Sequence, residues 1–175
     1  MQALDAFIAQ RLPKFSQYED AMRHGEAWHY HSHLSSAVNL KLIGAREVVE
    51  AAQAAFRAGH APLASGEGFV RRILGWREFV RGIYWTQMPG YAKRHGLDAQ
   101  AAMPAFYWSG DTDMACLHDL IGQTLKHGYS HHIQRLMVTG LYALLSGVRP
   151  QEVQGWYLTC MSMQWTGWNC PIRWA

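Results

Sequence analysis

A chain of 175 residues with a formal charge of +3 and 49% hydrophobic residues has the composition of a globular protein with one sizeable core. Three cysteines without paired spacing argue against a disulfide scaffold and favour a reducing compartment. The N-terminus lacks the layout of a signal peptide, and no apolar run approaches the ~20 residues of a membrane span, so we expect a soluble, cytoplasmic, single-domain protein.

Apolar residues recur with the period of a helix in every long segment, which predicts an all-α helical bundle of about six or seven helices. The first helix is expected over residues 2–12 and ends at Pro13; its apolar face consists of Leu4, Phe7, Ile8 and Leu12. The second is expected over residues 46–58, with these residues facing inward: Val49, Ala52 and Phe56.

A long helix follows, capped by Ser65 and extending to about Trp85, where Met88-Pro89-Gly90 ends it. Its residues in helical phase are Phe69, Ile73, Trp76, Val80, Ile83 and Tyr84. Residues 91–110 are expected to be irregular, and a last helix is expected to start at Pro150 and to run through Tyr157.

Two further helices meet at a turn in the middle of the C-terminal half. Acids and a hydroxyl at 111–113 are predicted to cap the first helix, and Gly128 is predicted to end it. The inward face of this helix consists of Leu117, Leu120, Ile121, Thr124 and Leu125. The second helix begins near Ser130 and places the following residues on its apolar stripe: Ile133, Leu136, Met137, Leu141, Leu144 and Leu145.

Several chemically capable residues each have a structural and a functional interpretation. Serines 32, 35 and 36 are either turn and cap residues or hydroxyls that hold a diphosphate. His131 and His132 point about 100° apart on a helix and cannot form the usual helical metal pair, so they are core or capping residues or a general acid. Cys116 is either a small buried residue or a thiolate ligand.

Four runs of the sequence resemble a known family. They are GEGFVRRILGWREFVRGIYW (66–85), FYWSGDTDMAC (106–116), YSHHIQRLMVTG (129–140) and, less closely, YHSHLSSAVNLKL (30–42). They are similar to the catalytic domain of the bacterial iron–sulfur branch of the photolyase/cryptochrome family, the prokaryotic (6-4) photolyases. The resemblance covers about Leu4 to Leu158, so it implies that 1–158 is part of a helical FAD- and DNA-binding domain.

The resemblance implies roles for individual residues. FAD would be bound by Tyr30, Ser32, Leu34, Ser35, Trp76, Arg77, Glu78 and Arg135. In the serine segment His31 replaces the first hydroxyl residue of the family pattern, and Arg135 matches an arginine that pairs with a carboxylate near the flavin ring. His132 corresponds to the proton donor over the lesion in damaged DNA, supported by His131. An electron relay is implied for Trp108, Trp156 and Tyr157.

Cys116 corresponds to the first ligand of a [4Fe–4S] cluster, but the other ligands of the family lie downstream of this chain. The α/β antenna domain and the second half of the flavin pocket also have no counterpart. We therefore expect an inactive, truncated fragment in which FAD binding is weak or absent and no cluster assembles.

A cryptochrome-type blue-light signalling flavoprotein without repair activity is the alternative, because the two classes share these residues. A third interpretation, which does not depend on the resemblance, is a helical fragment with no activity.

The resemblance stops after Leu158, and we interpret 159–175 as an out-of-frame tail. With suitable synonymous codons, the tail CMSMQWTGWNCPIRWA reads VYVDAVDWVELPNTLGM one base earlier, which resembles the family run after Trp-Tyr-Leu. On this hypothesis Cys160 and Cys170 are accidental and the tail packs poorly. The alternative is a divergent helix with a tryptophan-rich cap.

Overall fold

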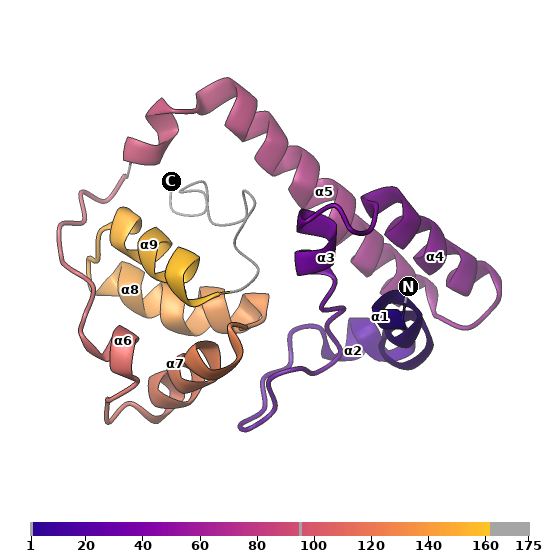
Figure 1. Cartoon of the computed structure of the whole chain (residues 1–175), viewed down its shortest axis with the longest axis horizontal. Coiled ribbons are helices and arrows are strands. Elements are labelled where there is room, and N and C mark those ends of the chain that lie inside the picture. The colour runs from indigo at the N-terminus through magenta and orange to yellow at the C-terminus, as the bar shows by residue number, and fades with distance from the viewer. Residues whose placement is uncertain (1, 95, 162–175) are drawn as a thin grey trace. The chain divides into compact units, whose positions relative to one another are not determined.

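Helices form the regular secondary structure of residues 2–94 and 96–161, which are the residues that the computed structural model describes (Figure 1). Within these ranges there is no strand, and an isolated bridge joins Ala101 to Val148. The Ala101 N–H donates to the Gly147 carbonyl and the Arg149 N–H donates to the Ala101 carbonyl, both at 2.9 Å. The prediction of an all-α protein is confirmed.

The chain divides into two compact units, where composition predicts a single domain. The first unit contains the described residues up to Ala21 together with Trp28–Gly82; the second contains Met22–Ala27 and the described residues from Ile83 onward. Each unit closes its own hydrophobic core, and this is the physical basis of the division. Helix α5 (Leu63–Gln87) begins in the first unit, and its last turn belongs to the second.

The N-terminal segment of the first unit is helical throughout but not uniform. It consists of α1 (Gln2–Ala6), the π-helix η1 (Phe7–Arg11), the 3-10 turn η2 (Leu12–Lys14) and α2 (Phe15–Tyr18). Pro13 does not end the helical run, because it lies in the first positions of η2, where no backbone N–H is required. The short helix α3 (Ser35–Asn39) and α4 (Ala45–Arg57) complete this part of the unit.

The first core forms around Phe7, whose side chain is fully buried against Phe69 of α5 at a centroid distance of 4.6 Å. The predicted inward position of Ala52 in α4 is confirmed, and the other two predictions are wrong by one position. Val48 and Ala55 are buried in place of Val49 and Phe56, and Phe56 is 41% exposed. In an alanine-rich helix the spacing of apolar residues shows the period but leaves the phase of the buried face open.

Helix α5 ends at Gln87, immediately before a cis Met88–Pro89 peptide, as the proline predicts. Its start differs from the prediction, because Leu63 is the first helical residue and Ser65 lies within the helix. Ser65 is fully buried; its Oγ accepts the Ser16 N–H at 3.1 Å and donates to the Ser16 Oγ at 3.0 Å. The serine therefore serves as a tertiary link to the N-terminal segment rather than as a cap.

The second unit consists of the C-terminal helices. They are η3 (Gly90–Lys93), α6 (Phe106–Ser109), α7 (Ala115–His127), the π-helix η4 (Gln134–Gly140), α8 (Leu141–Leu145) and α9 (Pro150–Cys160). Residues 132 and 133 are already helical, so one helical stretch runs from 132 to 145. Buried residues of α6, α7, α8 and α9 share one core; these include Tyr107, Leu117, Ile121, Ala143, Val153 and Trp156.

Two predictions about the central helix pair are corrected. The N-cap of α7 is Met114, and Thr112 instead accepts the Met114 N–H through its hydroxyl, so the acids at 111 and 113 precede the first turn. In the following helix the predicted apolar stripe is largely exposed, with Met137 at 57% and Leu145 at 79%. The buried positions are Gln134, Thr139, Gly140 and Ala143. The π-helix explains this shift, since its wider turn breaks the 3.6-residue phase on which the prediction depends.

The last helix, α9, extends beyond Leu158 to Cys160, and the next residue, Met161, is buried in the second core. The remainder of the predicted out-of-frame tail, residues 162–175, lies outside the described residues. Among the described helices, none combines the length and hydropathy that a membrane crossing requires.

Candidate functional site

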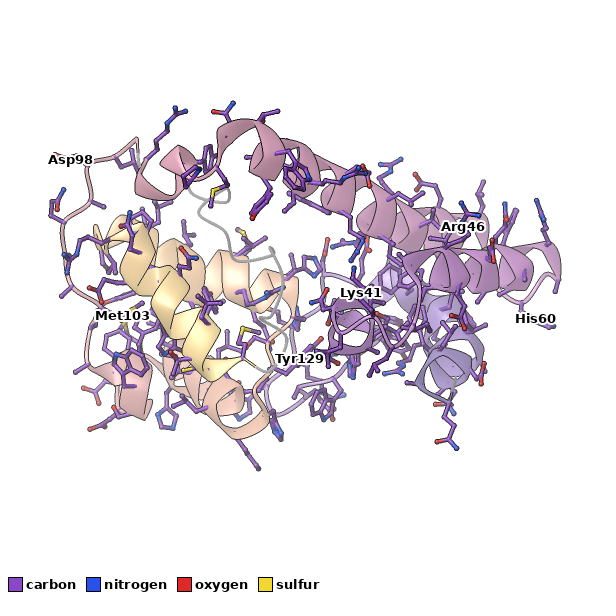
Figure 2. All side chains as sticks on the ribbon, turned by 45° about the horizontal axis from the view of Figure 1, so that its top comes forward. Lys41, Arg46, His60, Asp98, Met103 and Tyr129 are labelled. Atoms are coloured by element: carbon purple, nitrogen blue, oxygen red, sulfur yellow. The ribbon has the colours of Figure 1, made fainter. Side chains whose placement is uncertain are left out.

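The two predicted catalytic histidines lie at the turn between α7 and the next helix. Tyr129, which belongs to the same turn, is labelled in Figure 2. Gly128 ends α7 with a φ of 59°, and its N–H donates to the Thr124 carbonyl at 2.8 Å. The Thr124 and Ser130 hydroxyls share a hydrogen bond of 2.5 Å, which ties the turn to α7. Of the two residues, His131 is buried and His132 is partly exposed.

The two rings are in edge contact with each other. Their centroids lie 6.1 Å apart with an interplanar angle of 63°. His131 precedes the first helical residue, as a capping residue does, and His132 is that first helical residue. Sequence reasoning missed Gln134, whose side-chain Oε1 accepts the His131 backbone N–H at 3.0 Å. The signal was present, because a glutamine three residues after a cap position is typical of a capping box.

Arg135, one turn beyond the histidines, carries a guanidinium inside the second unit. Burial lowers the pKa of this group, and Tyr157 and Tyr129 act in the opposite direction. The Nε atom of Arg135 is buried without a hydrogen-bond partner among the described residues, and no carboxylate of that part of the chain forms an ion pair with the group. The predicted carboxylate partner is therefore not among the residues described.

The predicted relay residues on α9 lie in the second core in contact with each other. Trp156 is 1% exposed and its ring centroid lies 4.9 Å from that of Tyr157. The indole N–H of Trp156 donates to the Tyr107 carbonyl at 2.7 Å, and their ring centroids are 5.2 Å apart. Trp108 follows Tyr107 on α6 and is 51% exposed, so the relay residues include both a buried and a surface tryptophan.

Sequence reasoning also missed Tyr107, which links α6 to both α9 and η4. Its hydroxyl donates to the Thr139 carbonyl at 2.6 Å. The Tyr157 hydroxyl shares a 2.7 Å hydrogen bond with the Thr139 hydroxyl and donates to the Arg135 carbonyl at 3.0 Å. Burial raises the pKa of Tyr107, because the phenolate would lose its hydration. No local motif marks this residue, since its partner lies 32 positions away.

The predicted diphosphate segment belongs to the first unit. The ring of Tyr30 stacks on Tyr18 at a centroid distance of 4.9 Å, and Leu34 is a buried core residue. Ser32 and Ser35 are partly exposed, and the Ser32 hydroxyl accepts the Leu34 N–H at 3.4 Å. This hydrogen bond supports the turn interpretation for Ser32.

The predicted Trp76-Arg77-Glu78 run lies in α5, where the tryptophan is 42% exposed rather than a core residue. The basic side chains of this helix are largely neutralised within the first unit. Arg71 pairs with Glu67, Arg72 with Glu19 at 3.0 Å, and Arg81 with Glu78 at 3.1 Å. Arg77 forms no ion pair with any described residue. It is thus the cation of this group that could contact a phosphate without first losing an acid partner.

Cys116 is the second residue of α7 and is exposed, which contradicts the interpretation of a small buried residue. The other described cysteine, Cys160, is partly buried, and burial raises the pKa of its thiol. A [4Fe–4S] cluster takes four thiolates, whereas the whole chain contains three cysteines. This chain's own residues therefore do not fit such a cluster.

Comparison with known proteins supports the resemblance. No protein-family model matches the chain. It is 45% identical over 156 residues to a (6-4) photolyase of Agrobacterium fabrum, an alignment that covers 89% of this chain. The chain is a relative of the (6-4) photolyases. It spans about a third of that relative, 31% of its length. The resemblance stated from the sequence motifs is confirmed.

The fold of this photolyase relative is also found in a solved structure. A bacterial class III photolyase from Agrobacterium tumefaciens superposes with a TM-score of 0.82, covering 99% of this chain and 36% of that one. Sequence identity in this comparison is 19%, so it is evidence of a shared helical fold.

Proposed function

We propose that this chain forms a flavin- and lesion-binding part of a light-dependent DNA repair enzyme of the (6-4) photolyase type. The observation that carries the proposal is the 45% identity to a (6-4) photolyase over 89% of the chain. The chain spans 31% of that relative, so the activity, substrate and cofactor of this chain are part of the proposal.

Within each unit by itself, some residues suit a part of a bound FAD. The partly exposed Ser32 and Ser35 could offer hydroxyls to a diphosphate. Leu34 anchors that segment in the first core, and Tyr30 stacks on Tyr18. Arg135 has a buried Nε donor without a partner among the described residues, which favours an oxygen acceptor on a ligand. Bound reduced flavin supplies the electron that light transfers to a pyrimidine photoproduct.

Trp76 and Glu78 are the weaker members of the proposed flavin contacts. Trp76 offers an exposed aromatic face, with its ring in edge contact with Phe79 at 6.0 Å. Glu78 is already paired with Arg81, so any contact to a ligand must compete with that ion pair. Arg77 is assigned to phosphate binding, which would add affinity for damaged DNA without reading its sequence.

His132 is assigned as the proton donor to the lesion. Its ring is partly exposed, and an imidazole can hold and release a proton near neutral pH. His131 supports it from the buried side of the same turn. Trp108, Trp156 and Tyr157 are assigned as electron-relay residues, since Trp156 and Tyr157 are in ring contact and Trp108 is at the surface. No step is assigned to an iron–sulfur cluster.

The test begins with FAD titration of the purified chain, followed by flavin fluorescence. We expect a dissociation constant weaker than about 1 μM, because affinity depends on enclosing the ligand and much of the relative's length is not spanned. From the sequence we expect an inactive fragment because FAD binds weakly, and saturating FAD offsets weak binding. Under reducing conditions and blue light, the FAD-saturated chain should therefore convert a (6-4) photoproduct in an oligonucleotide back to pyrimidines. His132→Asn should slow this by about 100-fold or more without changing FAD affinity.

A dark sample and undamaged DNA are the controls. Complete absence of repair at saturating FAD, with folded protein, would overturn the proposal for this chain. Light-driven reduction of bound flavin without any repair would instead support the signalling alternative.

A further inference from the structure

Two glutamine side chains hold the turn that presents His131 and His132. Gln134 is 1% exposed and its Oε1 accepts two hydrogen bonds, from the His131 N–H at 3.0 Å and from the Gln123 Nε2 at 2.9 Å. The Nε2 of Gln134 donates to the Gln123 Oε1 at 3.2 Å, which closes a reciprocal amide pair. Gln123 also donates to the Tyr129 carbonyl at 3.4 Å.

The backbone dictates how both amides are oriented. A main-chain N–H can only donate, so the atom of Gln134 that faces His131 must be the oxygen. With that oxygen in place, the facing atom of Gln123 must be the nitrogen, which also suits the Tyr129 carbonyl. Rotating either amide by 180° would bring two donors or two acceptors together. The two side chains therefore have one compatible arrangement, and it is anchored at residues 129 and 131.

The pair connects three consecutive segments of the second unit. Gln123 belongs to α7, Tyr129 and His131 to the turn, and Gln134 to the start of η4. The spacing from His131 to Gln134 is that of a capping box, in which the third helical residue satisfies the N–H of the cap residue. Here that bond is buried, and a second helix supports the capping side chain. The orientation of the helix start, and of the His132 ring on it, depends on this arrangement.

We propose that Gln134 and Gln123 are positioning residues that set the His131–His132 turn in the orientation needed for proton donation by His132. The consequence for catalysis rests on the proposed function, whereas the control of the turn does not. Neither amide touches the reacting atoms. Their effect is geometric, and displacement of a reacting group by about 1 Å can lower a rate by about 100-fold.

The first test measures amide hydrogen exchange by NMR on the whole chain. Gln134→Leu removes the acceptor of the His131 N–H, and we expect exchange at His131 to rise about tenfold or more relative to amides of α9. Gln134→Glu keeps an acceptor oxygen and should fall between the parent and Gln134→Leu. Gln123→Leu leaves the His131–Gln134 bond intact and should have a smaller effect at His131 than Gln134→Leu.

The matched control is Val148→Ala, which creates a cavity in the same core without touching the turn. It should raise exchange throughout the second unit by a common factor. If Gln134→Leu and Gln134→Glu raise exchange at His131 no more than Val148→Ala does, the positioning role is overturned. If Gln134→Leu does not fold, the comparison of Gln134→Glu with Val148→Ala decides alone.

The second test measures repair per bound flavin at saturating FAD. Gln134→Leu should lower the maximal repair rate about tenfold to 100-fold with lesion affinity unchanged, and Val148→Ala should leave the rate per folded molecule unchanged. A parent chain that performs no repair refutes the proposed function, while the exchange data still decide the role of the glutamines in the turn. Normal repair by Gln134→Leu with faster exchange at His131 would overturn the catalytic consequence.

Discussion

Replacing Tyr107 with phenylalanine deletes one hydroxyl from the core of the second unit and leaves the ring in place. The lost hydrogen bond is the 2.6 Å contact from this hydroxyl to the Thr139 carbonyl. A buried carbonyl left without its donor costs about 1–3 kcal/mol, and Tyr107 is 1% exposed, so water cannot replace the phenol without a rearrangement. We expect the free energy of unfolding at pH 7 to fall by about 1–2 kcal/mol.

The same substitution should change the response to alkaline pH. Burial raises the pKa of Tyr107 in the folded protein, whereas the unfolded chain ionises near the ordinary value of about 10. Below that pH the Tyr107 hydroxyl is protonated in both the folded and the unfolded chain, so its contribution to the free energy of unfolding is fully present. Above it the unfolded chain loses the proton first, and stability falls by about 1.4 kcal/mol per pH unit. Tyr107→Phe lacks this ionisable group, so its free energy of unfolding does not show this fall. The difference in unfolding free energy between parent and variant should therefore vanish roughly one to two pH units above 10.

The assay is urea denaturation followed by circular dichroism from pH 7 to pH 11.5, with hydrogen exchange of peptides from α6, α7 and α9 to locate the loss. Tyr142→Phe is the matched control, because its ring contacts Tyr107 at 6.4 Å and its hydroxyl has no hydrogen bond to a described residue. It should change stability by less than about 0.5 kcal/mol. Equal stability of Tyr107→Phe and the parent at pH 7, or parallel pH curves, would refute the reasoning.

Three further outcomes follow from the structure. Ser65→Ala should destabilise the first unit by about 1–3 kcal/mol in urea denaturation, since it strands the Ser16 N–H. Ser109→Ala, at the exposed end of α6, should cost under about 0.5 kcal/mol, and equal effects of the two substitutions would contradict the burial argument. Arg77→Ala should weaken DNA binding and lower the slope of log affinity against log salt concentration by about 1. Arg72→Ala should have a smaller effect on both, because the Arg72 guanidinium is paired with Glu19 and Asp20. A larger effect of Arg72→Ala would count against the assignment of Arg77 to phosphate binding. Anaerobic purification should yield no stoichiometric iron and sulfide, because three cysteines cannot supply four thiolates; finding both would show that the ligand count is wrong.

Local chemistry in the sequence was sufficient to predict that the protein is helical and where several helices stop. The left-handed glycine at 128 and the proline at 89 act through their own backbone geometry, so α7 and α5 end where they were expected to end. The motifs around residues 66–85, 106–116 and 129–140 were likewise sufficient to indicate a resemblance to the (6-4) photolyases, and the 45% identity to one of them over 156 residues supports it.

Only the tertiary structure decided which faces are buried and which distant groups meet. The π-helix η4 changes the phase of its side chains, so Gln134 and Thr139 are buried where the helical period predicts leucines. Ser65 binds Ser16 across 49 positions, and Tyr107 binds Thr139 across 32. A local pattern contains no information about such partners, because the energy of a buried hydrogen bond depends on which group the fold places opposite it. The roles of Gln134 and Tyr107 therefore became visible only when the helices were assembled.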